Sequence, residues 1–133
     1  MDQNGGENII QFALEGHTIG DLYSFLTGDP ATYNIDALED SELVLISKSS
    51  HEELLKILPK YETYTRLQIT GAYLAMQKRI TSFISLSQEE RYSQLLKSSP
   101  NLLQRVPQHM IASFMGLKPE TLSRLRKKMA TAK

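Results

Sequence analysis

A single glycine separates two apolar helical patterns near the end of this 133-residue chain, and it restricts the possible folds more than any other feature. Gly116 follows the stretch QHMIASFM and precedes the stretch LKPETLSRLRKK. Glycine adopts a positive φ at little cost, so it can end one helix and let the chain turn into the next. Ala112, one turn earlier, is small enough to let a second helix cross closely. Residues 108–128 therefore predict two short helices that meet at a turn.

Each of these predicted helices has an apolar face and a polar face. The apolar residues recur at helical spacing and should pack together: Ile111, Met115, Leu117, Leu122 and Leu125. The second helix carries Glu120, Ser123, Arg124 and Lys127 at positions i, i+3, i+4 and i+7, on one polar face. Such a face can hydrogen-bond base edges and phosphates in a major groove. The pattern is typical of a helix-turn-helix, although an ordinary helical hairpin with a solvated charged face has the same spacing.

The charge of the chain is distributed unevenly. Residues 104–133 contain seven Lys/Arg and one Asp/Glu, a net charge of +6, whereas residues 1–103 contain eight and fourteen, a net charge of −6. The formal neutrality of the whole chain therefore conceals a basic end. A basic end beside a recognition-like helix is typical of proteins that bind duplex DNA, because neutralising phosphates releases counterions.

Three short runs around the glycine follow one another in a characteristic order. They are Gln104-Arg105-Val106-Pro107-Gln108-His109, then Ile111-Ala112-Ser113, and, after Gly116-Leu117, Pro119-Glu120-Thr121-Leu122-Ser123-Arg124. This arrangement resembles the DNA-binding end of the Crp/Fnr family of bacterial transcription regulators.

The resemblance assigns functions to individual side chains. It implies base contacts from Glu120, Ser123 and Arg124. The remaining expected DNA-binding residues are Lys127, Lys118, Arg105 and Gln108. Lys118 departs from the family pattern, which has Ser or Thr before the Pro-Glu pair, so we expect the second helix to be poorly capped.

Composition excludes several classes of site. The chain has no cysteine, which rules out disulfides, thiolate zinc sites and cysteine-ligated iron–sulfur clusters, and hence redox sensing of the Fnr type. We expect no cofactor. No apolar run approaches ~18 residues, and the first ten residues lack the basic and apolar segments of a signal peptide. The sequence therefore predicts a soluble cytoplasmic protein without a membrane partner.

Residues 9–47 alternate between short apolar stretches and turn residues. The stretches IIQFAL, IGDLYSFL, YNIDAL and ELVLIS predict strands and a short helical turn. By resemblance they correspond to the second half of a sensor β-roll. The expected fold is α+β: a partial, jelly-roll-like β-roll (residues 1–58), a dimerisation helix (59–85) and a winged-helix-like helix-turn-helix domain (86–133). Because half a roll exposes strand edges, we expect it to pair with another chain or to belong to a longer product.

The same resemblance places the remnant of an effector site in this region. Gly20, Asp21 and Thr32 fall near the segment that holds a cyclic-nucleotide phosphate in the family. Ala31 stands where the family has the phosphate-binding arginine, so we expect no cyclic-nucleotide binding. The alternative is that the glycines of this region only form turns.

A long helix is predicted in the middle of the chain. Ser50 and Glu53 form a capping-box pattern that should open a short helix, and Pro59 should stop it. Between residues 60 and 84, Ile69, Met76 and Phe83 then recur every seven residues. This repeat indicates a dimerisation helix, or else a single amphipathic helix packed within its own chain. A second capping box, SQEE at residues 87–90, should start the next helix, 89–97.

The sequence predicts a transcription regulator of the Crp/Fnr type that binds an inverted repeat as a dimer. Its expected partners are duplex DNA, a second copy of the chain and RNA polymerase. An alternative is a truncated interaction protein that pairs with a full-length relative and modulates it. We expect neither an enzyme nor a metal protein, since His17, His51 and His109 have no ligand spacing and no catalytic set is suggested.

Overall fold

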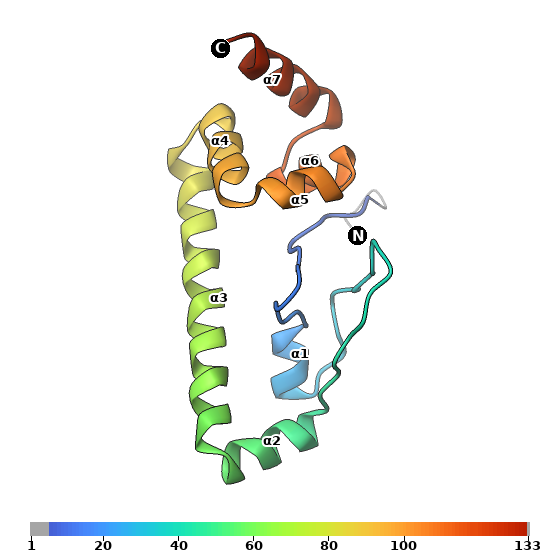
Figure 1. The fold of residues 1–133 in the computed structure, drawn as a ribbon, viewed down its shortest axis with the longest axis vertical. Helices are drawn as coiled ribbons and strands as arrows, with labels where there is room; N and C mark the ends of the chain where they lie inside the picture. Colours follow the sequence, from blue (N-terminus) through green and yellow to red (C-terminus); the bar gives the residue numbers. More distant parts are fainter. Residues whose placement is uncertain (1–5, 133) are drawn as a thin grey trace. The chain divides into compact units, whose positions relative to one another are not determined.

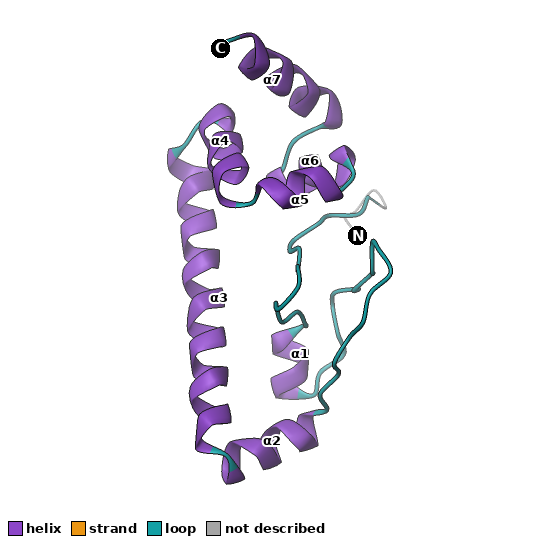
Figure 2. Cartoon of the chain, viewed as in Figure 1, coloured by secondary structure: helices purple, strands orange, loops and turns teal. Residues whose placement is uncertain are grey.

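The computed structural model describes residues 6–132, and every regular element in that range is a helix (Figure 2). In chain order the helices are α1 (Leu22–Thr27), α2 (Lys48–Ile57), α3 (Pro59–Ser85), α4 (Gln88–Ser98), α5 (Pro100–Arg105), α6 (Gln108–Met115) and α7 (Pro119–Thr131), as labelled in Figure 1.

The predicted α+β fold with a partial β-roll is wrong. No residue between 6 and 132 lies in a strand, and the apolar stretches that suggested strands lie in loops or in α1. A strand is stable only beside another strand, because its backbone N–H and C=O groups need partners across a ladder. Here the stretch at residues 9–14 packs against helices instead, and Leu43, Val44 and Leu45 remain exposed.

The described chain divides into two compact units, and the division falls within α3. One unit is Gly16–Arg79. The other combines the described residues up to Glu15 with those from Ile80 onward. This second unit contains the buried apolar cluster and the predicted helix-turn-helix.

Side-chain caps define the helices of the Gly16–Arg79 unit. Asp21 accepts the Ser24 amide and so starts α1, which ends at Gly28 in the left-handed region with φ 84°. Ser47 starts α2 by accepting the Ser50 amide at 3.1 Å. The N-cap predicted at Ser50 is therefore wrong by three residues. Ser47 also precedes the helical pattern, and it is Ser47 that occupies the N-cap position of α2.

Helix α3 confirms the predicted long helix, with 27 residues against the expected 25 or so. None of its residues is buried. The exposed apolar side chains include all three residues of the predicted seven-residue repeat, Ile69, Met76 and Phe83, together with Leu67, Tyr73, Leu74, Ile80 and Ile84.

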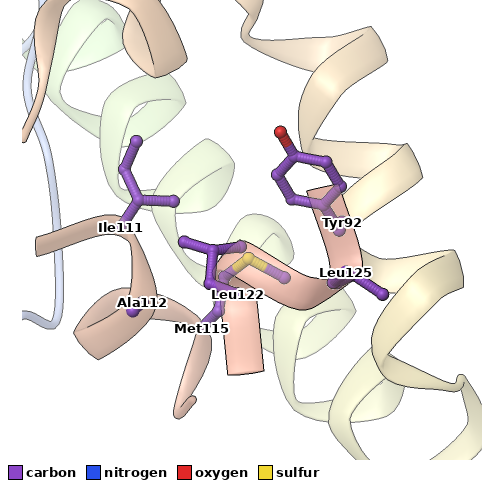
Figure 3. Close-up of a cluster of buried hydrophobic side chains, with 6 residues drawn as sticks. All are labelled: Tyr92, Ile111, Ala112, Met115, Leu122 and Leu125. Carbon is purple, nitrogen blue, oxygen red and sulfur yellow. The ribbon is translucent and has the colours of Figure 1, made fainter. Parts of the chain in front are cut away.

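The core of the second unit is formed by four helices, α4, α5, α6 and α7. Six of its buried side chains form one cluster, drawn in Figure 3: Tyr92, Ile111, Ala112, Met115, Leu122 and Leu125. Leu95, Leu103, Val106, Phe114, Leu117 and Met129 pack against them. Ala112 is completely buried, which confirms that this position needs a small side chain. The apolar faces predicted for the two helices around Gly116 are therefore correct.

The start of this four-helix unit was predicted well, but the next segment was not. Ser87 and Glu90 form the expected capping box in both directions, at 3.2 and 2.8 Å. Helix α5, in contrast, was not predicted. Pro100 ends the preceding pattern, but proline is also favoured at the first position of a helix, and here it starts α5 with Leu102 buried.

The winged-helix-like form predicted for residues 86–133 is not found in the described part of the chain. Helix α7 continues to Thr131, so the described residues contain no wing.

Candidate nucleic-acid interface

The turn between α6 and α7 is closed by backbone hydrogen bonds. Gly116 has φ 68°, and its amide donates to the carbonyl of Ser113 at 3.0 Å. The Leu117 amide donates to the carbonyl of Ala112 at 2.8 Å. Together these bonds form a Schellman-type ending that satisfies the last carbonyls of α6. The positive φ predicted for the glycine is confirmed.

Limited space beside a phenyl ring also favours glycine at this position. A Cβ atom added to Gly116 would lie 3.2 Å from Cε1 of Phe83. Phe83 lies near the C-terminal end of α3, and the short distance shows that its ring packs against the α6–α7 turn. Phe83 was predicted as part of a dimer seam, so this contact is one that the heptad spacing did not indicate.

Helix α7 presents a polar surface opposite its buried residues. Leu122 and Leu125 are buried, whereas Glu120, Arg124 and Lys127 are exposed. Ser123 is half-buried, at the edge of this surface. Arg124 lies along the helix, with its Nε donating to the backbone carbonyl of Glu120 at 3.4 Å. The i, i+3, i+4 and i+7 positions therefore share one side of the helix, with Ser123 nearest the core. Glu120, Ser123, Arg124 and Lys127 form what we call the α7 outer face.

The basic side chains near α7 fall into two groups. Lys118, Arg124 and Lys127 have no ion pair with any described acidic residue, so their charges face solvent. By contrast, Lys128 pairs with Glu89 of α4.

Two of the predicted DNA-binding residues are engaged within the chain. Gln108 accepts Nη1 of Arg126 through its Oε1 at 3.0 Å, which ties the start of α6 to α7. Arg105 forms a two-point ion pair with Glu15, with both N–O distances at 2.9 Å. Sequence reasoning missed both partners, because 18 and 90 residues separate the contacting pairs.

The start of α7 lacks a side-chain cap. Lys118 occupies the N-cap position without a capping hydrogen bond, and Pro119 follows it. The first N–H groups of a helix have no partners within the helix, and they carry the positive end of its dipole. The poor capping predicted from Lys118 is thus confirmed, and the helix start can accept an anion.

The three residues of the predicted effector remnant lie in the Gly16–Arg79 unit. The Asp21 carboxylate accepts the amides of Ser24 at 3.1 Å and Thr32 at 2.8 Å. The hydrogen bonds from the amides of Ser24 and Thr32 hold the pKa of Asp21 below its usual value. Asp21 and Thr32 are therefore brought together, but through the backbone of Thr32, and the carboxylate organises the loop after α1. A Cβ atom added to Gly20 would have no neighbour within 4 Å, so no close approach requires glycine there.

Within residues 6–132, no group of three or more His, Asp or Glu side chains gathers in a way that would hold a metal ion. No helix in this range combines the length and apolar character needed to cross a bilayer. No protein-family model, curated protein or solved structure matches the chain.

Proposed function

We propose that the α4–α7 unit binds duplex DNA in a sequence-specific manner, and that the chain acts as a dimeric transcription regulator on an inverted-repeat site. The single observation that carries this proposal is the α7 outer face. A buried apolar core holds one side of the helix, and Glu120, Arg124 and Lys127 are exposed on the other.

The chemistry of this face suits a major groove. Arg124 can donate two hydrogen bonds to O6 and N7 of a guanine, and Glu120 can accept one from a cytosine amino group. The intrahelical contact of Arg124 is long, at 3.4 Å, and exposed, so little is lost when the guanidinium turns towards a base. Ser123 and Lys127 suit phosphate or register contacts.

Charge and rigidity give independent support. Lys118 and Lys127 face solvent and have no acidic partner among the described residues, so they are available to neutralise phosphates. The uncapped start of α7 adds backbone donors for another phosphate. The Schellman-type turn and the buried Ala112 fix the angle between the two helices. A fixed angle suits sequence recognition, because side chains that contact bases must be held in one geometry.

Dimerisation through α3 is part of the same proposal. Ile69, Tyr73 and Met76 share one side of the helix and are 41%, 65% and 61% exposed. A second copy of the same surface would cover these side chains in a two-fold arrangement, which is the commonest symmetry of soluble oligomers. Two copies of α7 would then read an inverted repeat with half-sites about one helical turn apart.

A selection experiment tests the proposal directly. The purified chain is incubated with random duplexes at near-physiological salt, and the bound DNA is recovered, amplified and sequenced over several rounds. We expect enrichment of an inverted repeat that contains G·C pairs in each half-site. If the recovered sequences stay random after selection and binding disappears as the salt concentration is raised, the chain binds DNA only through non-specific attraction to its basic end, and the proposal of sequence-specific binding is wrong.

A further inference from the structure

Residues 6–15, which we call the strap, belong to the same compact unit as α4–α7 and contact α5 and α6; Figure 1 shows the backbone of the first part of the strap passing α6. The Ile9 amide donates to Oγ of Ser113 at 2.9 Å, and this hydroxyl donates to the Glu7 carbonyl at 3.4 Å. The ring of Phe12 lies 5.1 Å from the ring of Phe114, centroid to centroid, at an interplanar angle of 55°. The strap is therefore attached to α6 by both polar and aromatic contacts.

Both acidic side chains of the strap lie near groups that would contact a phosphate backbone. Glu15 occupies the guanidinium of Arg105 with two hydrogen bonds of 2.9 Å. At the other end, Glu7 and Asn8 line a shared hollow with His109 and Lys118, beside the uncapped start of α7.

DNA bound to the α7 outer face would need the surface that the strap covers. In a helix-turn-helix, the first helix crosses the DNA backbone while the second lies in the groove. Here the first helix is α6, whose Ser113 and Phe114 contact the strap. Two carboxylates close to a DNA backbone would also repel it.

We propose that the strap is an autoinhibitory element that competes with duplex DNA for α6, Arg105 and the start of α7. This inference rests on the proposed DNA-binding function and adds regulation to it. DNA binds only the strap-released state, so the apparent affinity equals the affinity of that state multiplied by the fraction of molecules in which the strap is released. Any ligand or partner that removes the strap would activate the protein.

The contacts of the strap have a strength that suits a switch. The Glu15–Arg105 pair is exposed, with 36% of the arginine side chain and 78% of the glutamate side chain accessible. An exposed pair of this kind shifts an equilibrium by about two- to fivefold. The aromatic pair of Phe12 and Phe114 adds a comparable factor. The strap is therefore held firmly enough to reduce DNA binding and loosely enough to be displaced.

The experiment compares strap variants of the full chain by fluorescence anisotropy with a labelled duplex at fixed salt. Glu15→Gln removes the ion pair and keeps the size of the side chain. Phe12→Ala removes the aromatic contact without changing charge. The matched control is Glu42→Gln, which makes the same charge change at an exposed residue of the other unit. We expect Glu15→Gln to tighten binding about two- to fivefold, Phe12→Ala to tighten it at least as much, and Glu42→Gln to change it less than twofold.

Hydrogen exchange gives a second, independent readout. Coupling between two binding events is reciprocal, so bound duplex should release the strap. The Ile9 amide should exchange faster when DNA is present, while amides of α6 and α7 become protected.

The outcomes separate the two proposals. If the wild-type chain binds duplex but neither variant binds more tightly, and the Ile9 amide is equally or more protected with DNA, autoinhibition is wrong and DNA binding stands. If neither the wild type nor any variant binds duplex, both proposals are wrong. If Glu42→Gln tightened DNA binding as much as Glu15→Gln, the effect would come from the change in net charge, and autoinhibition by the strap would be wrong.

Discussion

The guanidinium of Arg91 donates through Nη1 to the backbone carbonyl of Met115 at 2.9 Å, joining α4 to the last residue of α6. Its Cζ also lies 4.2 Å from the centre of the Phe83 ring, within cation–π distance. Nε of Arg91 is buried and has no hydrogen-bond partner among the described residues. The ring and the carbonyl are therefore the groups that compensate the buried part of this charge.

The first prediction concerns the stability of the turn. Arg91→Ala should expose the Met115 carbonyl and the ring of Phe83, and destabilise the α4–α7 unit by about 1–3 kcal/mol. Amide hydrogen exchange in α6 and α7 measures the change. The control is Arg66→Ala, which removes an exposed pair with Glu62 on α3 and should cost at most ~0.5 kcal/mol. Equal effects of the two substitutions would mean that Arg91 does not support the turn.

The second prediction separates base readout from phosphate contact. Arg124→Ala should cost ~1–3 kcal/mol on the selected site and relax preference at one base pair. Lys127→Ala should weaken specific and random duplexes alike and lower the slope of affinity against salt by about one. Titrations with both duplexes at several salt concentrations measure this difference. If Arg124→Ala weakens specific and random DNA equally, Arg124 does not contact a base.

The third prediction concerns the oligomeric state. Replacing Ile69 and Met76 with Glu places charges in the proposed seam, so we expect monomers in analytical ultracentrifugation while the wild type sediments as a dimer. Thr70→Glu is the control, since Thr70 is exposed on α3 away from the Ile69–Met76 line. Phe83 is left intact because its ring also packs against Gly116 and Arg91. A wild type that is monomeric at all concentrations would exclude the dimer.

The fourth prediction is a pH dependence centred on Asp21. Hydrogen bonds from the Ser24 amide, and then from the Thr32 amide, lower the pKa of Asp21 below 3.8. A carboxyl group with a lowered pKa in the folded state stabilises that state above its ordinary pKa. This stabilisation is lost as the pH falls below about 4 and through the pKa of the folded state. Amide resonances of Ser24 and Thr32 should move together in an NMR titration, with a midpoint below 3.8.

The control for that titration is Asp21→Asn, in which the common transition of the two amides should disappear. A transition that persists in this variant would belong to another group. A midpoint at or above the ordinary value would contradict the proposed hydrogen bonding.

Local patterns predicted the two helices on either side of Gly116 and the turn between them correctly, because the interactions that define them are close in sequence. The inward residues of α6 and α7 follow the helical repeat, Gly116 takes the φ that only glycine adopts easily, and Ser87 caps α4 three residues from Glu90. The spacing of residues in α7 also predicted its outer face correctly, because Leu122 and Leu125 are buried on the opposite side of the helix.

The predicted strands failed for the opposite reason. Stretches such as IIQFAL and ELVLIS have the composition of strands, but strand formation depends on a neighbouring strand that the composition of one segment does not reveal. Residues 9–14 belong instead to a strap that packs on α6, about 100 residues away in the sequence. Pro100 similarly indicates the end of one helix in the sequence. That Pro100 also begins α5 is seen only in the structure, where Leu102 of α5 is buried.

The sequence by itself determined the helical hairpin, its turn, its apolar faces and the basic outer residues of α7. Each of these depends on spacings of three to eight residues and on the conformational freedom of one glycine. The tertiary structure decided which cations remain available: Arg105 is paired with Glu15, whereas Arg124 and Lys127 face solvent. It also decided that Phe83 and Arg91 support the turn. These contacts join residues far apart in the chain, and their geometry exists only once the helices have packed, so no local pattern contains it.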